Sequence, residues 1–130
     1  MVQILLNDED CSVGSVEELD EFLGRVARTS PCDLWLGIGD GPSLCMLKQS
    51  EFSWLMYLRF SGNSGFYTIG DIDAKGKATF TLGNGQVDEY PIAFCIELEQ
   101  ALKAISYFWI NEGRRPDWIE WRESRPGDGW

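Results

Sequence analysis

The chain has 130 residues, 44% of them hydrophobic and 13% aromatic, which is enough for one domain with its own core and too apolar for a disordered chain. It carries 21 Asp and Glu against 11 Lys and Arg, so its formal net charge is -10 and its surface would repel a nucleic-acid backbone. It contains no His, which excludes a Ser-His-Asp triad, a Cys-His nucleophile and a His-ligated metal site.

The start of the chain predicts a strand followed by a helix. A short apolar run, residues 2–6, is typical of a strand, and it ends in the acidic turn 7–10. Ser15 and Glu18 then have the spacing of a capping box, in which each side chain satisfies a free amide of the first helical turn. Apolar residues follow at three- and four-residue spacing as far as Val26, which predicts an amphipathic helix.

The middle of the chain predicts a run of strands joined by short turns. The expected strands are residues 34–38, 43–47, 53–60, 66–69 and 78–82. Successive strands with short connections favour an antiparallel meander. Residues 53–60 form the longest aromatic run, and we expect them to be a central strand.

The last part of the chain predicts a second helix and a short final strand. Pro91 is expected to begin the helix, which runs to about Asn111 and is closed by Gly113. A strand over residues 118–121 follows. The fold class is therefore α+β, an antiparallel meander with two main helices packed on it. Residues 1–123 form the single domain and residues 124–130 a loose C-terminal tail.

The cysteines and the absence of targeting segments favour a soluble, cytoplasmic protein. The four cysteines include no Cys-x-x-Cys pair, which argues against a zinc ribbon and a thioredoxin-like motif. Cys45 and Cys95 have apolar neighbours, so we expect buried thiols in a reducing compartment, with disulfides as the alternative because the count is even. The N-terminus lacks the basic start of a signal peptide, and no apolar stretch approaches the ~20 residues of a membrane span.

Two glycine-containing turns imitate ligand-binding loops without completing them. In residues 37–42, Pro42 stands where a dinucleotide fingerprint needs Gly, and no Gly-Lys-Ser/Thr ending follows. Residues 71–76 begin like a calcium loop, but Lys75 stands at a ligand position and Leu82 where a bidentate Glu is required. We therefore expect hairpin turns, no metal and no cofactor.

The carboxylates and one tryptophan are better suited to binding than to catalysis. Carboxylate pairs are numerous, but they fall in turns or on outward helix faces where charges are solvated, so we expect no enzyme. Strand alternation separates Trp118 and Glu120 from Ile119 and Trp121, which leaves Trp118 either as a contact residue or packed on the second helix. The candidate partner-binding residues, all in turns or at strand ends, are Asp71, Asp73, Asp88, Glu89, Trp118 and Glu120.

An ordered series of motifs resembles the type 1 immunity-protein family of bacterial polymorphic toxin systems. The series covers roughly residues 53–123 and agrees more weakly with the first helix. Its parts are Gly62-Asn-Ser-Gly-Phe66, Ile69-Gly70, Pro91, Ala101-Leu102, Tyr107-Phe108, Gly113, Pro116 and Ile119-Glu-Trp121.

This resemblance implies a small cytoplasmic α+β protein that binds and neutralises a cognate toxin domain and has no catalytic residues of its own. Such toxins are often nucleic-acid deaminases and sometimes nucleases. An acidic protein can occupy a basic groove in place of phosphate, so we expect inhibition by occlusion of the toxin's active site. The alternatives are a small acidic adaptor or chaperone-like accessory protein without a toxin partner, and a carboxylate-based hydrolase.

Overall fold

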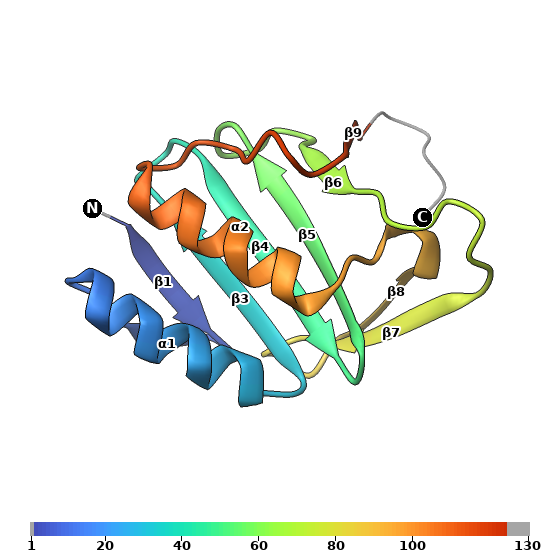
Figure 1. Ribbon diagram of the computed structural model, residues 1–130, viewed down its shortest axis with the longest axis horizontal. Coiled ribbons are helices and arrows are strands. Elements are labelled where there is room, and N and C mark those ends of the chain that lie inside the picture. The colour runs from blue at the N-terminus through green and yellow to red at the C-terminus, as the bar shows by residue number, and fades with distance from the viewer. Residues whose placement is uncertain (1, 125–130) are drawn as a thin grey trace.

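The computed structural model describes residues 2–124, which form a sheet with two helices on one side (Figure 1). The large sheet is antiparallel, with the strand order β2-β1-β3-β4-β5-β6-β9. Its strands are β1 (Gln3–Leu6), β2 (Glu9–Cys11), β3 (Cys32–Gly37), β4 (Ser43–Gln49), β5 (Phe52–Leu58), β6 (Phe66–Thr68) and β9 (Trp121–Glu123). The other elements are the hairpin strands β7 (Lys77–Thr81) and β8 (Val87–Pro91), the helices α1 (Val16–Arg28) and α2 (Leu98–Ile110), and the 3-10 helix η1 (Ile92–Phe94).

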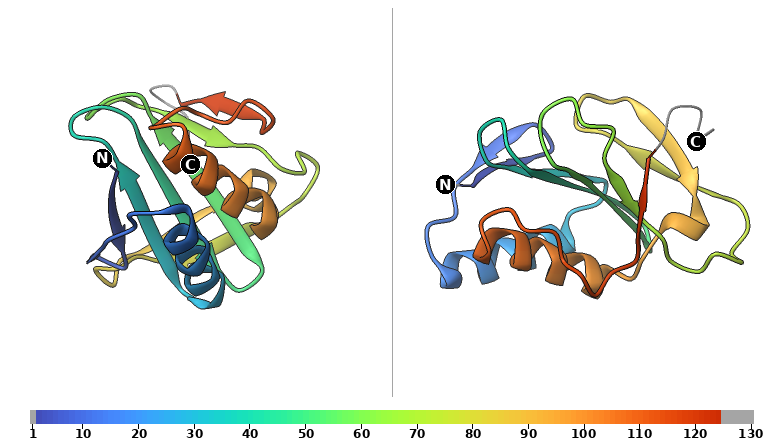
Figure 2. Two further views of the ribbon diagram at one scale, coloured as in Figure 1. Left: turned by 60° about the vertical axis from the view of Figure 1, so that its left-hand side comes forward. Right: turned by 90° about the horizontal axis from the view of Figure 1, so that it is seen from above.

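The middle of the large sheet is buried from both sides. Both helices cover one face, and the β7–β8 hairpin covers one end of the other face (Figure 2). On the helix side, Leu34, Leu44 and Met46 pack in one core; on the hairpin side, Trp54 and Phe80 pack in a second. Because both of its faces are buried, β4 does not alternate between buried and exposed side chains but is buried at five consecutive residues.

Helix α1 begins where the sequence predicts, with a modified cap. Ser15 Oγ accepts a hydrogen bond from the Glu18 amide at 3.1 Å, as expected for an N-cap serine. The Glu18 carboxylate accepts from the amide of Gly14 and not from that of Ser15, one residue earlier than in a capping box.

The second helix begins later than the sequence predicts, at Leu98 and not at Pro91. Pro91 ends β8, the short 3-10 helix η1 follows, and the chain then reaches β5 at Ile96 before α2 begins. The Ile96 amide donates to the Ser53 carbonyl at 2.8 Å, and the Ile96 carbonyl accepts from Ser53 Oγ at 2.6 Å. The predicted start at Pro91 was wrong because the sheet, and not a first helical turn, satisfies these backbone groups.

The α+β class and the meander are confirmed, since β3 to β6 are neighbours in chain order and β5 is an interior strand. The strand expected at 78–82 does not join this meander, because β7 pairs with β8. The sequence analysis missed β8, and it missed β2, which overlaps the expected turn 7–10. The last strand begins at Trp121 and not at residue 118. Of the expected tail, residues 125–130 lie outside the described part of the chain.

All four cysteines are free thiols. Cys32 is fully buried between the sheet and the helices, and burial raises the pKa of its thiol from 9.0 to about 12, with the Lys48 charge opposing the shift. Burial is also the main cause that raises the pKa of Cys45 well above 9.0. Both groups therefore stay protonated in the folded chain at pH values where an unfolded chain has lost these protons.

We expect the free energy of unfolding to fall as the pH rises above 9. Between pH 9 and 12 the unfolded chain binds fewer protons than the folded chain, so each such thiol contributes a slope of up to about 1.4 kcal/mol per pH unit. Urea unfolding between pH 7 and 10.5 measures this slope. Cys32→Ala should flatten the slope above pH 9. The packing cost of this substitution lowers stability equally at pH 7 and therefore does not affect the slope. If the slope stays unchanged in Cys32→Ala, the thiol of Cys32 is not its source.

Candidate functional site

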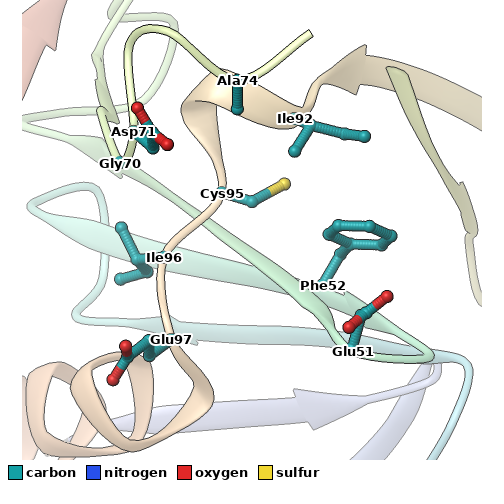
Figure 3. Close-up of a pocket in the computed structure, with 9 residues that line it drawn as sticks. All are labelled: Glu51, Phe52, Gly70, Asp71, Ala74, Ile92, Cys95, Ile96 and Glu97. Carbon is teal, nitrogen blue, oxygen red and sulfur yellow. The ribbon is translucent and has the colours of Figure 1, made fainter. Parts of the chain in front are cut away.

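A groove of about 500 Å³ opens where the turn before β5, the loop after β6 and the segment between β8 and α2 meet (Figure 3). Its floor is apolar, with Phe52, Ile92, Cys95 and Ile96 between three carboxylates. The carboxylates come from three different segments and stand around the rim; they are Glu51, Asp71 and Glu97. We call this feature the acid-rimmed groove.

The wall formed by residues 70–74 is held against residues 93–95 by close backbone contacts. The Gly70 amide donates to the Ala93 carbonyl at 2.8 Å, and a Cβ atom on Gly70 would lie 1.8 Å from the Cys95 carbonyl oxygen. Asp71 Oδ1 accepts from the Asp73 amide at 3.0 Å, which closes the turn that carries both carboxylates. Residue 70 must therefore be glycine, because any side chain would collide with the backbone at Cys95.

The rim carboxylates are exposed and carry charge that no described cation pairs with directly. Within residues 2–124 the one ion pair closer than 4.0 Å is Glu99–Lys103, which belongs to the outer face of α2. Glu51, Asp71 and Glu97 therefore present negative charge beside an apolar floor. This combination suits the side chain of a Lys or Arg, whose stem is apolar and whose head is cationic.

The thiol in the groove is unsuited to nucleophilic chemistry. Burial raises the pKa of Cys95 from 9.0 to about 11, so the thiol is protonated at neutral pH, and the thiolate is the reactive form. In the part of the chain that the structure describes, no group of three His, Cys, Asp or Glu residues could hold a metal ion. What the groove offers is charge and apolar surface.

The predicted contact residues are only partly brought together. Asp71 lies on the groove rim, and Asp73 is exposed beside it. Glu120 is exposed close to this loop, since its carbonyl accepts from the Ile69 amide at 3.1 Å.

Asp88 and Glu89 lie on β8 and face opposite sides of the hairpin. Asp88 is in register with the buried Phe80 and is half-buried, whereas Glu89 is in register with Thr79 and is exposed. The two neighbouring acids therefore cannot act on one surface.

Trp118, two residues before Glu120, packs against α2. Its Nε1 donates to Gln100 Oε1 at 3.1 Å, and its ring meets that of Tyr107 edge to face at a centroid distance of 5.1 Å. Trp118 remains 46% exposed, so it packs on the second helix and still offers apolar surface.

Sequence analysis did not single out Glu51 or Glu97 as contact residues. Glu51 was visible as an acid in the tight turn between two strands, but Glu97 was expected on an outward helix face. Glu51 and Glu97 lie on the same rim only because residues 95–97 follow an extended path, which no local pattern predicts.

The family model of Immunity protein Imm1 matches residues 7–123, which include both helices and the strands from β2 to β9. The chain belongs to the Imm1 family. The resemblance read from the sequence is thereby confirmed, and membership supports an immunity function against a toxin, with a cognate toxin as the partner. No curated protein matches this Imm1 chain. Among residues 2–124, no helix is both long enough and apolar enough to cross a bilayer.

We expect Gly70→Ala to destabilise the protein by about 1–3 kcal/mol, because the added methyl group must push residues 70–74 away from the Cys95 carbonyl. Gly37→Ala is the matched control, since a Cβ there would lie 3.6 Å from its nearest neighbour, an ordinary contact. Urea unfolding of both variants measures the difference. Equal losses in the two variants would show that the wall is not tightly packed at Gly70.

Proposed function

We propose that this Imm1 protein neutralises a cytoplasmic toxin that acts on nucleic acid, with a deaminase as the first candidate, by covering the toxin's active site. The observation that carries the proposal is the acid-rimmed groove, where Glu51, Asp71 and Glu97 surround an apolar floor. An enzyme that acts on nucleic acid needs a cationic surface for phosphates. A protein with a formal net charge of -10 competes for that surface.

Charge also supports rapid capture of the toxin. Attraction between an acidic protein and a basic partner can raise association rates toward about 10⁸–10⁹ M⁻¹s⁻¹. A rapid association matters here because each free toxin molecule turns over substrate until it is bound. Inhibition by this route requires one immunity protein for each toxin and no chemistry by the immunity protein itself.

The contact face extends beyond the groove. A standard interface covers about 800 Å² on each partner, which is about a ninth of the accessible surface of 7384 Å². We place its centre at Asp71 and its edges at Asp73 and Glu120, which are exposed on the same turn and just before β9. Trp118 would contribute if the toxin also reached the first turn of α2, and Glu89, on the outward side of the hairpin, lies outside this face.

The neighbouring upstream reading frame supplies the direct test of function. Its product should stop growth when expressed alone and be harmless when expressed with this protein, and the two should purify as a 1:1 complex. A deaminase assay on single-stranded DNA and RNA, with and without the immunity protein, then identifies the chemistry that is blocked. A weak association with several unrelated proteins and no protection would favour the adaptor alternative.

Reversing charge on the groove rim should slow association with the toxin. We expect Glu51→Lys with Asp71→Lys to lower the association rate by about tenfold at low salt and to flatten its salt dependence. Asp20→Lys with Glu21→Lys is the matched control, because it makes the same change in net charge on the exposed side of α1. Stopped-flow association at several salt concentrations measures both. If the two double variants slow association equally, only net charge matters and the groove is not the contact face.

A further inference from the structure

A second pocket, of about 200 Å³, lies between the large sheet and β8, on the side of the sheet opposite the helices. Trp35, Cys45 and Met56 line it from the sheet, and Asp88 and Tyr90 line it from the hairpin. Asp33 also lines it, from the start of β3. None of these residues lines the acid-rimmed groove.

Asp33 brings an unsatisfied charge to this pocket. The residue is only 7% exposed; Oδ2 accepts from the Gly83 amide at 3.0 Å, and Oδ1 has no hydrogen-bond partner among the described residues. Its register with Leu47 places it on the hairpin side of the sheet. The buried cation Lys48, one residue along β4, therefore faces the helix side, where it donates to the Thr29 carbonyl. A buried oxygen without a hydrogen-bond donor lowers the stability of the folded state, and a donor from a ligand would remove that cost.

Asp88 adds a second carboxylate that can accept further hydrogen bonds. It accepts from Gln86 Nε2 at 2.8 Å and from the Tyr90 hydroxyl at 3.2 Å. An ionised carboxylate has about four acceptor sites, so further donors can be accommodated. Both acids act on Cys45, whose thiol pKa is raised first by burial and then by Asp33, with Cys32 and Asp88 adding to the effect.

The pocket adjoins a part of the sheet that the hairpin leaves uncovered. One register row on this face joins Asp10, Leu5, Trp35, Cys45 and Met56 across the sheet. Leu5 is 40% exposed, and a second recess of about 170 Å³ shares Trp35 as a wall. A side chain can therefore approach over the Trp35 ring.

We propose that this pocket receives an arginine side chain of the toxin, with the guanidinium on the Asp88 carboxylate and its stem on Trp35. The identity of the partner rests on the proposed function, whereas the chemistry of the pocket does not. Arginine is favoured because its guanidinium is weakly hydrated, stacks on aromatic rings and binds carboxylates through two parallel hydrogen bonds. Asp33 lines the same pocket and adds a second acid, which strengthens the attraction because a charge away from water is poorly screened.

An arginine in this pocket would be an anchor of the interface. Side chains that carry most of the binding energy are enriched in Trp and Arg and lie in desolvated pockets. Such contacts act mainly on the dissociation rate, whereas exposed charges act on the association rate. The two acidic sites of this protein thus differ in a measurable way.

Asp88→Asn and Glu89→Gln form a matched pair for the test with the toxin. Each removes one negative charge from β8, but only Asp88 faces the pocket. We expect Asp88→Asn to weaken binding of the cognate toxin about tenfold or more, through faster dissociation, and Glu89→Gln to change the dissociation rate less than twofold. Surface plasmon resonance measures both rates, and thermal unfolding checks that both variants are folded. Equal dissociation rates for the two variants would overturn the proposal.

A small probe tests the pocket without the toxin. Acetyl-arginine amide, titrated into the full chain, should shift the indole N–H signal of Trp35, assigned from Trp35→Phe. Acetyl-citrulline amide, its neutral isostere, should not shift that signal. Asp88→Asn should abolish the shift and Glu89→Gln should retain it. Equal shifts from the two probes, or no loss in Asp88→Asn, reject the arginine site. If the wild-type protein fails to bind the toxin, the proposed function fails, and this titration still decides the pocket.

Discussion

Burial of the sheet from both sides is the constraint on which the rest of this structure depends. Strands β4 and β5 are covered by α1 and α2 on one face and by the β7–β8 hairpin on the other. The hairpin is held by the stack of Trp54 on Tyr90, with ring centroids 4.2 Å apart and planes 10° from parallel. Apolar surface removed from water in this way drives folding, so the position of the hairpin follows from the core and not from its turns.

The two-sided core also decides where the charges lie. The middle of the sheet has almost no room for polar side chains, so most carboxylates are displaced to turns and to the edges of the layers. The acid-rimmed groove arises where three such places meet, at Glu51, Asp71 and Glu97. Asp33 is the exception, because its carboxylate is buried where the hairpin meets the sheet. A polar group in that position needs a partner, which the hairpin loop supplies in part through Gly83.

Membership of the Imm1 family and the charge of the chain are independent observations, and both agree with a protein that binds a toxin. The family indicates an immunity function and a cognate toxin, but it does not specify a contact face. Charge and shape do suggest faces: a groove whose exposed acids would steer a basic partner, and a pocket whose enclosed acids would hold one. On this view the exposed acids of the groove would govern the association rate, and the acids of the pocket would govern the dissociation rate.

The sequence by itself determined the acidic balance, the α+β class, the first helix and the strands from β3 to β6, because these follow from composition and from periods of two and 3.6 residues. It also indicated the family through short motifs in order. Only the tertiary structure decided that β7 and β8 leave the sheet, that α2 begins at Leu98, and that Asp88 and Glu89 face opposite ways. These features depend on contacts between distant segments, such as Ile96 with Ser53 and Tyr90 with Trp54, and residues so far apart leave no local pattern in the sequence.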